Sequence, residues 1–191
     1  MVAIRLEKSS DAAAREALLD LAYGPVRFAK PSERLRAGRA PARGLSFVAV
    51  DEDSQKNSKV IGTVRLWDVS AGPACPALLL GPLAVDPAQR RRGVGSALMR
   101  HALRAAARRG HRVVLLAGDA SYYGRFGFSA ERTAGLWLPG LADKSRLLGR
   151  ELVAGSLDGV RGAIRAPKRA VRTPLVAAIA GLSPSLKPKA A

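Results

Sequence analysis

Three consecutive arginines and two glycines lie where an apolar segment gives way to a helical pattern. They form the sequence RRRGVGS over residues 90–96, between a strand predicted over Leu78–Val85 and a helix predicted over Gly93–Arg109. The first turn of a helix leaves about four backbone N–H groups unpaired and carries roughly half a positive charge. Glycine lets an anion approach these groups closely, and arginine adds charge. The segment is therefore a candidate phosphate-binding loop.

Two familiar phosphate-binding loops are excluded by the residues present. A Walker A loop ends in Gly-Lys followed by Ser or Thr, and the chain contains no Gly-Lys dipeptide. A dinucleotide-binding fingerprint needs a third glycine at the position that Leu98 occupies. Glycines at a helix start also serve tight turns, so the two glycines alone leave a purely structural role open.

A third pattern fits the loop. Arg90-x-x-Gly93-x-Gly95 resembles the acyl-CoA-binding motif, [Arg/Gln]-x-x-Gly-x-[Gly/Ala], of the GNAT superfamily of N-acetyltransferases. Downstream, the sequence YGRFGF, which begins at Tyr123, is similar to the Tyr-x-x-x-Gly-Phe element of the same family. The longer block GDASYYGRFGF also resembles a bacterial subgroup of predicted N-acetyltransferases. The resemblance covers about residues 2–165 and is strongest at these two motifs.

The resemblance implies an α/β fold with a central mixed, mostly antiparallel sheet that is splayed at a β-bulge and flanked by helices. Gly81-Pro82 gives a reason for a bulge inside the strand Leu78–Val85, because proline cannot donate a ladder hydrogen bond. A plain turn between two short strands is the alternative.

The resemblance also implies acetyl-CoA as co-substrate and a set of binding residues. The pantetheine arm would lie along the strand after the bulge, and the pyrophosphate would rest on backbone N–H groups of the loop. The cofactor-binding residues expected on this basis are Leu83, Ala84, Val85, Arg90, Arg91, Arg92, Gly93, Val94, Gly95, Ser96, Asp119 and Tyr123.

Tyr123 is the candidate catalytic residue. Acetyl transfer to an amine expels the CoA thiolate, whose thiol has a cysteine-like pKa of about 8.5, and a phenol of pKa about 10 can donate a proton to it. The resemblance assigns this general-acid role to Tyr123 and not to Tyr122. The alternative is that both tyrosines pack in the core with Phe126 and Phe128.

The general base has no assigned residue. The strand Leu78–Val85 contains no carboxylate, so Asp68 before it and Asp119 after the next strand are the candidates. Asp119 is favoured instead as the cap of a short helix at Ser121. A water molecule, or an acceptor amine of lower pKa, would remove the need for a protein base.

Metal and disulfide chemistry are not expected. The chain has one cysteine, Cys75, which excludes an intrachain disulfide and a zinc site built from several cysteines. His101 and His111 have no acidic neighbours at ligand spacing. The N-terminus carries charges within its first eight residues and lacks the apolar segment of a secretory signal. We therefore expect a cytoplasmic protein.

The elements expected to position these residues are of mixed α and β type. Besides the strand and helix around the loop, the predicted elements are a strand at Val2–Leu6, helices at Ala12–Ala22 and Pro31–Gly38, a hairpin of Leu45–Val50 and Val60–Val69, a strand at Arg112–Ala117, a short helix at Asp119–Phe126, and strands at Leu136–Leu138 and Val160–Arg165.

Length and composition agree with one globular domain. The chain has 191 residues, of which 48% are hydrophobic and 25% charged. We expect an acetyltransferase-like domain over residues 1–165 and a basic, proline-containing tail over 166–191. No apolar segment of about 20 residues is present, so no membrane partner is expected.

The charge supports a competing hypothesis. Lys and Arg number 32 against 15 Asp and Glu, a formal net charge of +17. A basic RNA- or ribosome-associated binding protein with a vestigial or regulatory acyl-CoA site is therefore the alternative to an N-acetyltransferase acting on a primary amine. Nucleic acid is not favoured, because aromatic residues make up only 5% and single-strand RNA binding relies on stacking. Whether the protein is a homodimer is left open.

The acceptor amine is not identified by the sequence. The resemblance places it beside the first helices and the C-terminal strands, here Tyr23–Gly38 and Leu136–Arg165. Basic and aromatic residues of these segments are Arg27, Arg34, Arg36, Trp137 and Lys144. A basic lining would favour an acidic amine.

Overall fold

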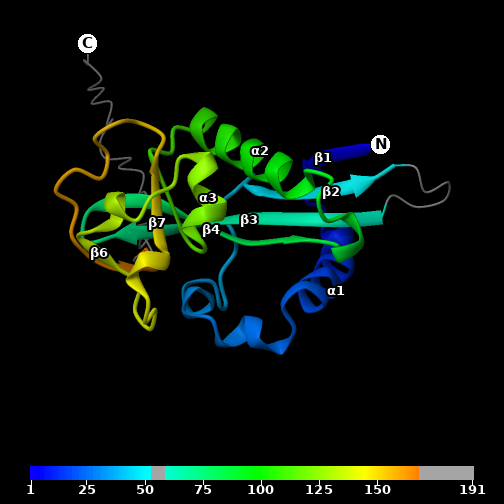
Figure 1. Ribbon diagram of the computed structural model, residues 1–191, viewed down its shortest axis with the longest axis horizontal. Coiled ribbons are helices and arrows are strands. Elements are labelled where there is room, and N and C mark those ends of the chain that lie inside the picture. Colours follow the sequence, from blue (N-terminus) through cyan, green and yellow to red (C-terminus); the bar gives the residue numbers. More distant parts are fainter. Residues whose placement is uncertain (53–58, 168–191) are drawn as a thin grey trace, which may run out of the picture.

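One sheet runs through the centre of the protein in the strand order β1-β2-β3-β4-β5-β7 (Figure 1). The computed structural model describes residues 1–52 and 59–167. The strands are β1 (Val2–Leu6), β2 (Ser46–Asp51), β3 (Lys59–Ala71), β4 (Cys75–Val85), β5 (Val113–Ala117), β6 (Leu136–Trp137), β7 (Leu147–Glu151) and β8 (Gly162–Arg165). Strand β8 pairs with the end of β3 and with β6.

Most neighbouring strands in the sheet are antiparallel. The exceptions are the pairs β4–β5 and β6–β8, which are parallel. The α-helices are α1 (Ala12–Tyr23), α2 (Val94–Arg108) and the single turn α3 (Ala120–Tyr123). Two 3-10 turns, η2 (Pro25–Ala29) and η3 (Pro31–Leu35), lead from α1 to β2. The predicted mixed α/β fold is thus confirmed.

The two long helices cover opposite faces of the sheet (Figure 1). Alternate residues of β2 show this, since Phe47 and Ala49 pack in the cluster that contains α2, whereas Val48 and Val50 pack with α1. Successive side chains of a strand point to opposite faces, so a strand covered on both sides is apolar throughout. Helix α2 packs closely on β3 at Gly62, where an added Cβ would lie 2.8 Å from the Leu98 side chain.

Several boundaries differ from the sequence expectation. The helix predicted over Pro31–Gly38 is the shorter 3-10 turn η3, preceded by η2, because the prolines at the first position of each turn interrupt a continuous helix. Strand β7 was not predicted at all. The tail expected over 166–191 lies outside the described residues from 168 onward. In the described part of the chain, no helix is long and apolar enough to cross a bilayer, and no group of metal-ligating side chains occurs.

Candidate active site

Strands β4 and β5 separate part-way along the sheet. They pair in parallel only at Leu78–Val114 and Leu79–Leu115, so the rest of β4 has no partner strand on this side. On the other side, the register with β3 shifts where Gly81 and Pro82 together face one residue. The strand nevertheless continues from Cys75 to Val85. The bulge predicted at Gly81-Pro82 is therefore confirmed, and the plain turn is excluded.

Two side chains from elsewhere in the chain hold the bulge. The indole Nε1–H of Trp67 donates to the Gly81 carbonyl at 2.7 Å, and the Tyr23 hydroxyl, at the end of α1, donates to the Leu83 carbonyl. Buried backbone groups need such partners where the ladder is interrupted. The expected pantetheine-binding residues, Leu83 to Val85, lie just beyond, on the part of β4 that has separated from β5.

The candidate phosphate-binding loop is anchored at its beginning and open at its end. The Asp86 carboxylate accepts from the Ala88 N–H at 2.9 Å and pairs with Lys59 Nζ at 2.9 Å. At the other end, Gly93 precedes α2 with a φ of +76°, and no side chain caps the helix. The first helical hydrogen bond runs from the Ala97 N–H to the Gly93 carbonyl, so the N–H groups of residues 94–96 precede it.

The arginines of the loop are exposed and lack acidic partners. Arg90, Arg91 and Arg92 form no ion pair with any described residue, and Arg92 donates only to the Gln89 side chain. Arg91 has a φ of +65°, a left-handed conformation that costs a non-glycine residue about 1–2 kcal/mol. Guanidinium groups without acidic partners, beside backbone N–H groups that precede the first helical hydrogen bond, are the features expected of an anion-binding loop.

Tyr122 and Tyr123 occupy different places. Tyr122 lies against the helix start, because an added Cβ on Gly95 would be 3.1 Å from its hydroxyl oxygen. Tyr123 instead lines a cavity at the place where β4 and β5 separate, called the split below. Its ring packs so closely on Gly118 that an added Cβ there would be 2.2 Å from the ring. Both rings also contact the core, with centroids 5.8 Å apart for Tyr122–Phe126 and 6.2 Å for Tyr123–Phe128.

The cavity at the split has a volume of about 80 Å³. Its lining comes from α1, η2, η3, β4, β5 and α3, namely Tyr23, Arg27, Lys30, Ser32, Glu33, Arg36, Leu80, Gly81, Pro82, Leu83, Leu116, Ala117 and Tyr123. Burial raises the pKa of Tyr123 above its ordinary value. Its hydroxyl has no hydrogen-bond partner among the described side chains and backbone groups. The phenol therefore stays protonated at neutral pH and is free to donate to a ligand.

Comparison with known proteins identifies the domain. Residues 42–130 match the acetyltransferase (GNAT) domain. The chain carries a GNAT-family acetyltransferase domain. The resemblance drawn from the two sequence motifs is thereby confirmed. Comparison with curated proteins gave no match.

Three solved structures of GNAT-family acetyltransferases resemble this chain, and two of them contain CoA or acetyl-CoA. The GNAT family N-acetyltransferase YhbS from Escherichia coli, in complex with CoA, is 29% identical with a TM-score of 0.73 over 86% of this chain and 89% of that chain. A GNAT family acetyltransferase from Brucella melitensis, in complex with acetyl-CoA, is 28% identical with a TM-score of 0.64 over 86% and 95%. A GNAT family acetyltransferase from Staphylococcus aureus, 13% identical with a TM-score of 0.52 over 80% and 99%, shares the fold.

The two carboxylates considered as bases lie away from the cavity of this GNAT domain. Asp119 is exposed, and its carboxylate caps α3 by accepting from the Ser121 N–H at 2.9 Å, the structural alternative raised by the sequence. Hydrogen bonds from Ser121 lower the pKa of Asp119, which makes it a weaker base. Asp68 is exposed on β3, opposite Leu78. The carboxylate that does line the cavity, Glu33, was not predicted.

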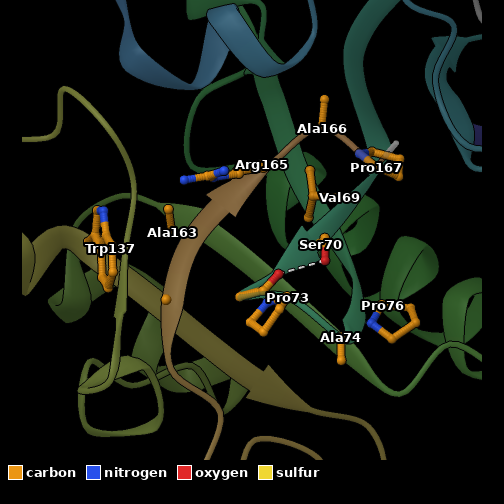
Figure 2. Close-up of a pocket in the computed structure, with 12 residues that line it drawn as sticks. Val69, Ser70, Pro73, Ala74, Pro76, Trp137, Ala163, Arg165, Ala166 and Pro167 are labelled. Carbon is orange, nitrogen blue, oxygen red and sulfur yellow. Dashed lines mark hydrogen bonds between the residues drawn. The ribbon is translucent and has the colours of Figure 1, made fainter. Parts of the chain in front are cut away.

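Only one of the two segments expected to bind the acceptor contributes to this cavity. Tyr23–Gly38 supplies six of its lining residues. Trp137 and Arg165, from the C-terminal segment, line a separate cavity of about 650 Å³ at the far end of β3 (Figure 2). Among the described residues that line it, Arg165 is the one ionisable side chain, so these residues offer no acid–base pair for group transfer.

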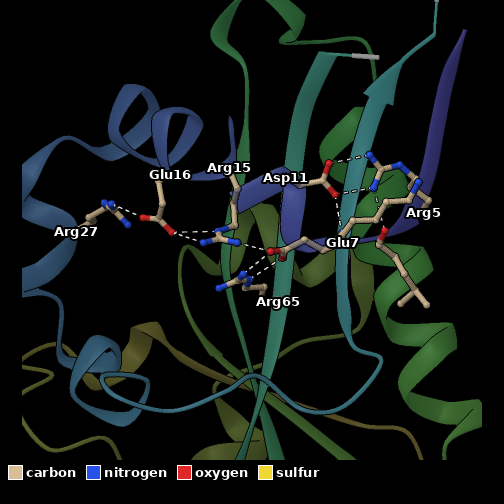
Figure 3. Close-up of polar contacts among 9 residues, drawn as sticks. Arg5, Glu7, Asp11, Arg15, Glu16, Arg27 and Arg65 are labelled. Carbon is tan, nitrogen blue, oxygen red and sulfur yellow. Dashed lines mark hydrogen bonds and ion pairs between the residues drawn. The ribbon is translucent and has the colours of Figure 1, made fainter. Parts of the chain in front are cut away.

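A chain of ion pairs holds α1 and η2 beside the cavity (Figure 3). The buried Glu7 carboxylate pairs with both Arg15 and Arg65. Glu16 links Arg15, at 2.7 Å, to Arg27, at 2.6 Å. These contacts connect the end of β1, α1, η2 and β3. The network therefore fixes the elements that carry Tyr23 and Arg27 into the cavity wall.

Proposed function

We propose that the protein is an N-acetyltransferase that moves an acetyl group from acetyl-CoA to a primary amine by direct transfer. The observation that carries the proposal is the opening between β4 and β5, which has the uncapped start of α2 at one end and Tyr123 at the other. Support for the donor comes from the CoA and acetyl-CoA bound in the Escherichia coli and Brucella melitensis proteins.

Different residues around the split bind different parts of acetyl-CoA. The N–H groups of residues 94–96 and the guanidinium groups of Arg90, Arg91 and Arg92 bind the pyrophosphate. Leu83, Ala84 and Val85 pair with β3 on one side, and on the side where β5 has separated their backbone hydrogen-bonds to the pantetheine arm as an additional strand would. A backbone N–H near Leu83 polarises the acetyl carbonyl.

Transfer exchanges a carbon–sulfur bond for a carbon–nitrogen bond. The neutral amine attacks the acetyl carbon, the C–S bond breaks, and the electron pair leaves with sulfur. The Tyr123 hydroxyl donates a hydrogen bond to this sulfur. Burial raises the pKa of Tyr123, whereas the CoA thiol has a pKa of about 8.5, so complete proton transfer from the phenol is uphill. Stabilisation of the thiolate, with the final proton coming from solvent, is therefore the role that we assign to Tyr123.

The amine loses its proton to water in this scheme. Glu33 is the one carboxylate among the described residues that line the cavity, and it is paired with Arg36 at 3.1 Å. Asp119 is engaged in capping α3. A water molecule next to the amine therefore takes the proton and passes it to bulk solvent.

The adjacent tyrosines provide a matched test of this role. Tyr123→Phe should lower kcat at least about 10-fold, since it removes one hydrogen bond to a developing charge, and should leave the Kd for acetyl-CoA within about twofold. Tyr122→Phe should leave kcat near that of the wild type. Thiol release and calorimetry measure the two quantities. Equal kcat values for Tyr123→Phe and the wild type would refute the role of the hydroxyl.

A second candidate function rests on the exposed face of α2. Arg100, Arg104 and Arg108 lie there in a row, without an acidic partner among the described residues. This row would suit the backbone of a nucleic acid in a basic RNA- or ribosome-associated protein. Binding of a short RNA that weakens steeply between low and physiological salt would support this function. RNA affinity that is unmeasurable at physiological salt would exclude it.

A further inference from the structure

One guanidinium nitrogen of Arg36, Nη1, forms no hydrogen bond with the described residues. The side chain is 94% buried. Its Nη2 donates to Ser32 Oγ at 2.9 Å and pairs with Glu33 at 3.1 Å, and its Nε donates to the Ser32 carbonyl at 3.2 Å. No described residue accepts a hydrogen bond from Nη1, which would lie 3.7 Å from a Cβ on Gly81. Arg36 therefore directs toward the bulge of β4 a guanidinium nitrogen that has no partner among the described residues.

Lys30 adds a second cation to the same wall. Its Nζ lies 3.8 Å from the centre of the Tyr23 ring, and none of the described carboxylates forms an ion pair with it. Burial lowers the pKa of Lys30, and the like charges of Arg36 and Arg146 lower it further. Repulsion of this kind is relieved when an anion binds between the cations.

Arg27, the third cation that lines the cavity, differs from Lys30 and Arg36 in having two carboxylate partners. Arg27 pairs with Glu16 at 2.6 Å and with Asp20 at 2.8 Å, so its charge is neutralised within the protein. Lys30 has no such partner, and Arg36 shares a single carboxylate through one of its nitrogens. The uncompensated positive charge of the cavity is thus concentrated at Lys30 and at Nη1 of Arg36.

The size of the cavity limits the ligand. About 80 Å³ is well below the roughly 300–1,000 Å³ of a site that encloses a drug-sized molecule. It admits a carboxylate or an amine head group, while the remainder of an acceptor stays outside. A planar carboxylate accepts hydrogen bonds from both a guanidinium and an ammonium group.

We infer that the acceptor is a small amine that also carries a carboxylate, such as an α-amino acid, and that Lys30 and Arg36 bind this carboxylate. The inference rests on the proposed acetyltransferase function. Glu33 and Ser32 orient the Arg36 guanidinium, and the amine of the acceptor then lies toward Tyr123, which lines the same small cavity.

The test compares amines that differ in one charge. Thiol release from acetyl-CoA is measured with glycine against glycinamide, leucine against leucinamide, and with aminomethylphosphonate and phenylethylamine. The quantity of interest is the ratio of kcat/KM for acid and amide. Comparing this ratio between enzyme variants cancels the intrinsic reactivity of each amine.

Lys30→Gln should lower the acid-to-amide ratio about 10-fold, as expected for the loss of one charged hydrogen bond. Lys30→Arg should largely restore it. Arg43→Gln is the control, because it removes the same charge from another exposed residue that does not line the cavity, and it should leave the ratio unchanged. A higher rate with aminomethylphosphonate than with glycine would overturn the carboxylate in favour of a phosphonate or phosphate group.

The remaining outcomes separate this inference from the proposed function. The inference is overturned if Lys30→Gln leaves the ratio unchanged, or if only phenylethylamine is acetylated. Binding of acetyl-CoA without thiol release by any acid of the panel also overturns it, while leaving the donor site intact. Failure of the folded protein to bind acetyl-CoA would instead refute the proposed acetyltransferase function itself.

Discussion

The arginines around α1 and the arginines before α2 have opposite surroundings. Arg5, Arg15, Arg27 and Arg65 each form an ion pair with a carboxylate (Figure 3). The three arginines of residues 90–92 are exposed and form none within the described part of the chain. The 32 lysines and arginines therefore include two populations, one that forms ion pairs within the fold and one that is available to an anion.

The largest effect on stability is expected from Glu7, the carboxylate at the centre of the ion pairs around α1. Glu7 is 7% exposed and neutralises Arg15 and Arg65. Glu7→Gln should lower the free energy of unfolding by about 3 kcal/mol, because it leaves the mostly buried Arg65 guanidinium without a counter-charge and Arg15 with the more exposed Glu16 alone. Glu131→Gln, at an exposed residue, should change it by less than about 0.5 kcal/mol. Urea unfolding measures both, and similar values for the two variants would break the comparison.

The unpaired population can be tested with two glycines at opposite ends of α2. Gly93 has a φ of +76° and Gly110 a φ of +79°, and an added Cβ would meet no atom within 4 Å at either. Gly93→Val and Gly110→Val should therefore carry similar backbone strain. Gly93→Val alone should weaken acetyl-CoA binding, by about 100-fold, because its side chain enters the space proposed for the pyrophosphate. Equal losses of affinity would show that strain, not a binding site, matters at Gly93.

A smaller effect is expected at Asp11, and it depends on pH. Arg5 donates to both carboxylate oxygens, at 2.6 and 2.8 Å, and this lowers the pKa of Asp11 from 3.8 to about 2. The folded-state pKa lies below the unfolded value, so the pair stabilises the protein fully above pH 3.8 and is lost as the pH falls toward 2. Asp11→Asn should cost about 1–2 kcal/mol at pH 7 and abolish this part of the acid dependence.

Unfolding curves from pH 2 to pH 7 provide the measurement for Asp11. The wild type and Asp11→Asn should converge in stability at the acid end. A constant difference between them across the whole range would mean that packing, and not the ion pair, accounts for the effect of the substitution.

The smallest effect concerns strain at Arg91. Glycine adopts a φ of +65° without steric cost, so Arg91→Gly should raise the free energy of unfolding by up to about 1 kcal/mol. Loss of one guanidinium should weaken acetyl-CoA binding about 5- to 10-fold. Opposite changes in stability and affinity, measured by urea unfolding and calorimetry, would sharpen the contrast with Glu7. A variant that loses stability as well as affinity would place Arg91 in the stabilising population.

The central part of the fold was predictable because its signals are local. The apolar residues of α2 recur at helical spacing, and Gly81-Pro82 interrupts an otherwise regular strand, so both are visible within short segments. The resemblance at two motifs then gave the arrangement of the sheet. It also favoured Tyr123 over Tyr122 as the catalytic residue, which stays a prediction. Tyr123 lines the cavity, whereas the Tyr122 hydroxyl lies against Gly95.

The rest depends on contacts between distant residues. Strand β7 contains a glycine and two charged residues, and it forms because β5 offers an antiparallel partner. Gly149 in this strand is needed for close packing, since an added Cβ would be 2.8 Å from Thr133. Similarly, Tyr23 meets the Leu83 carbonyl, and Arg36 meets the bulge, only after folding. No pattern in the sequence around Lys30 and Glu33 indicates that they share a cavity with Tyr123.

Calorimetric titration of acetyl-CoA into the purified protein, free of nucleic acid and at moderate salt, tests the central claim most directly. The wild type should bind with saturation and micromolar affinity. A variant in which Arg90, Arg91 and Arg92 are all replaced by glutamine should bind at least about 100-fold more weakly, with an almost unchanged free energy of unfolding. Absence of binding by the folded wild type, or equal binding by the variant, would contradict the account.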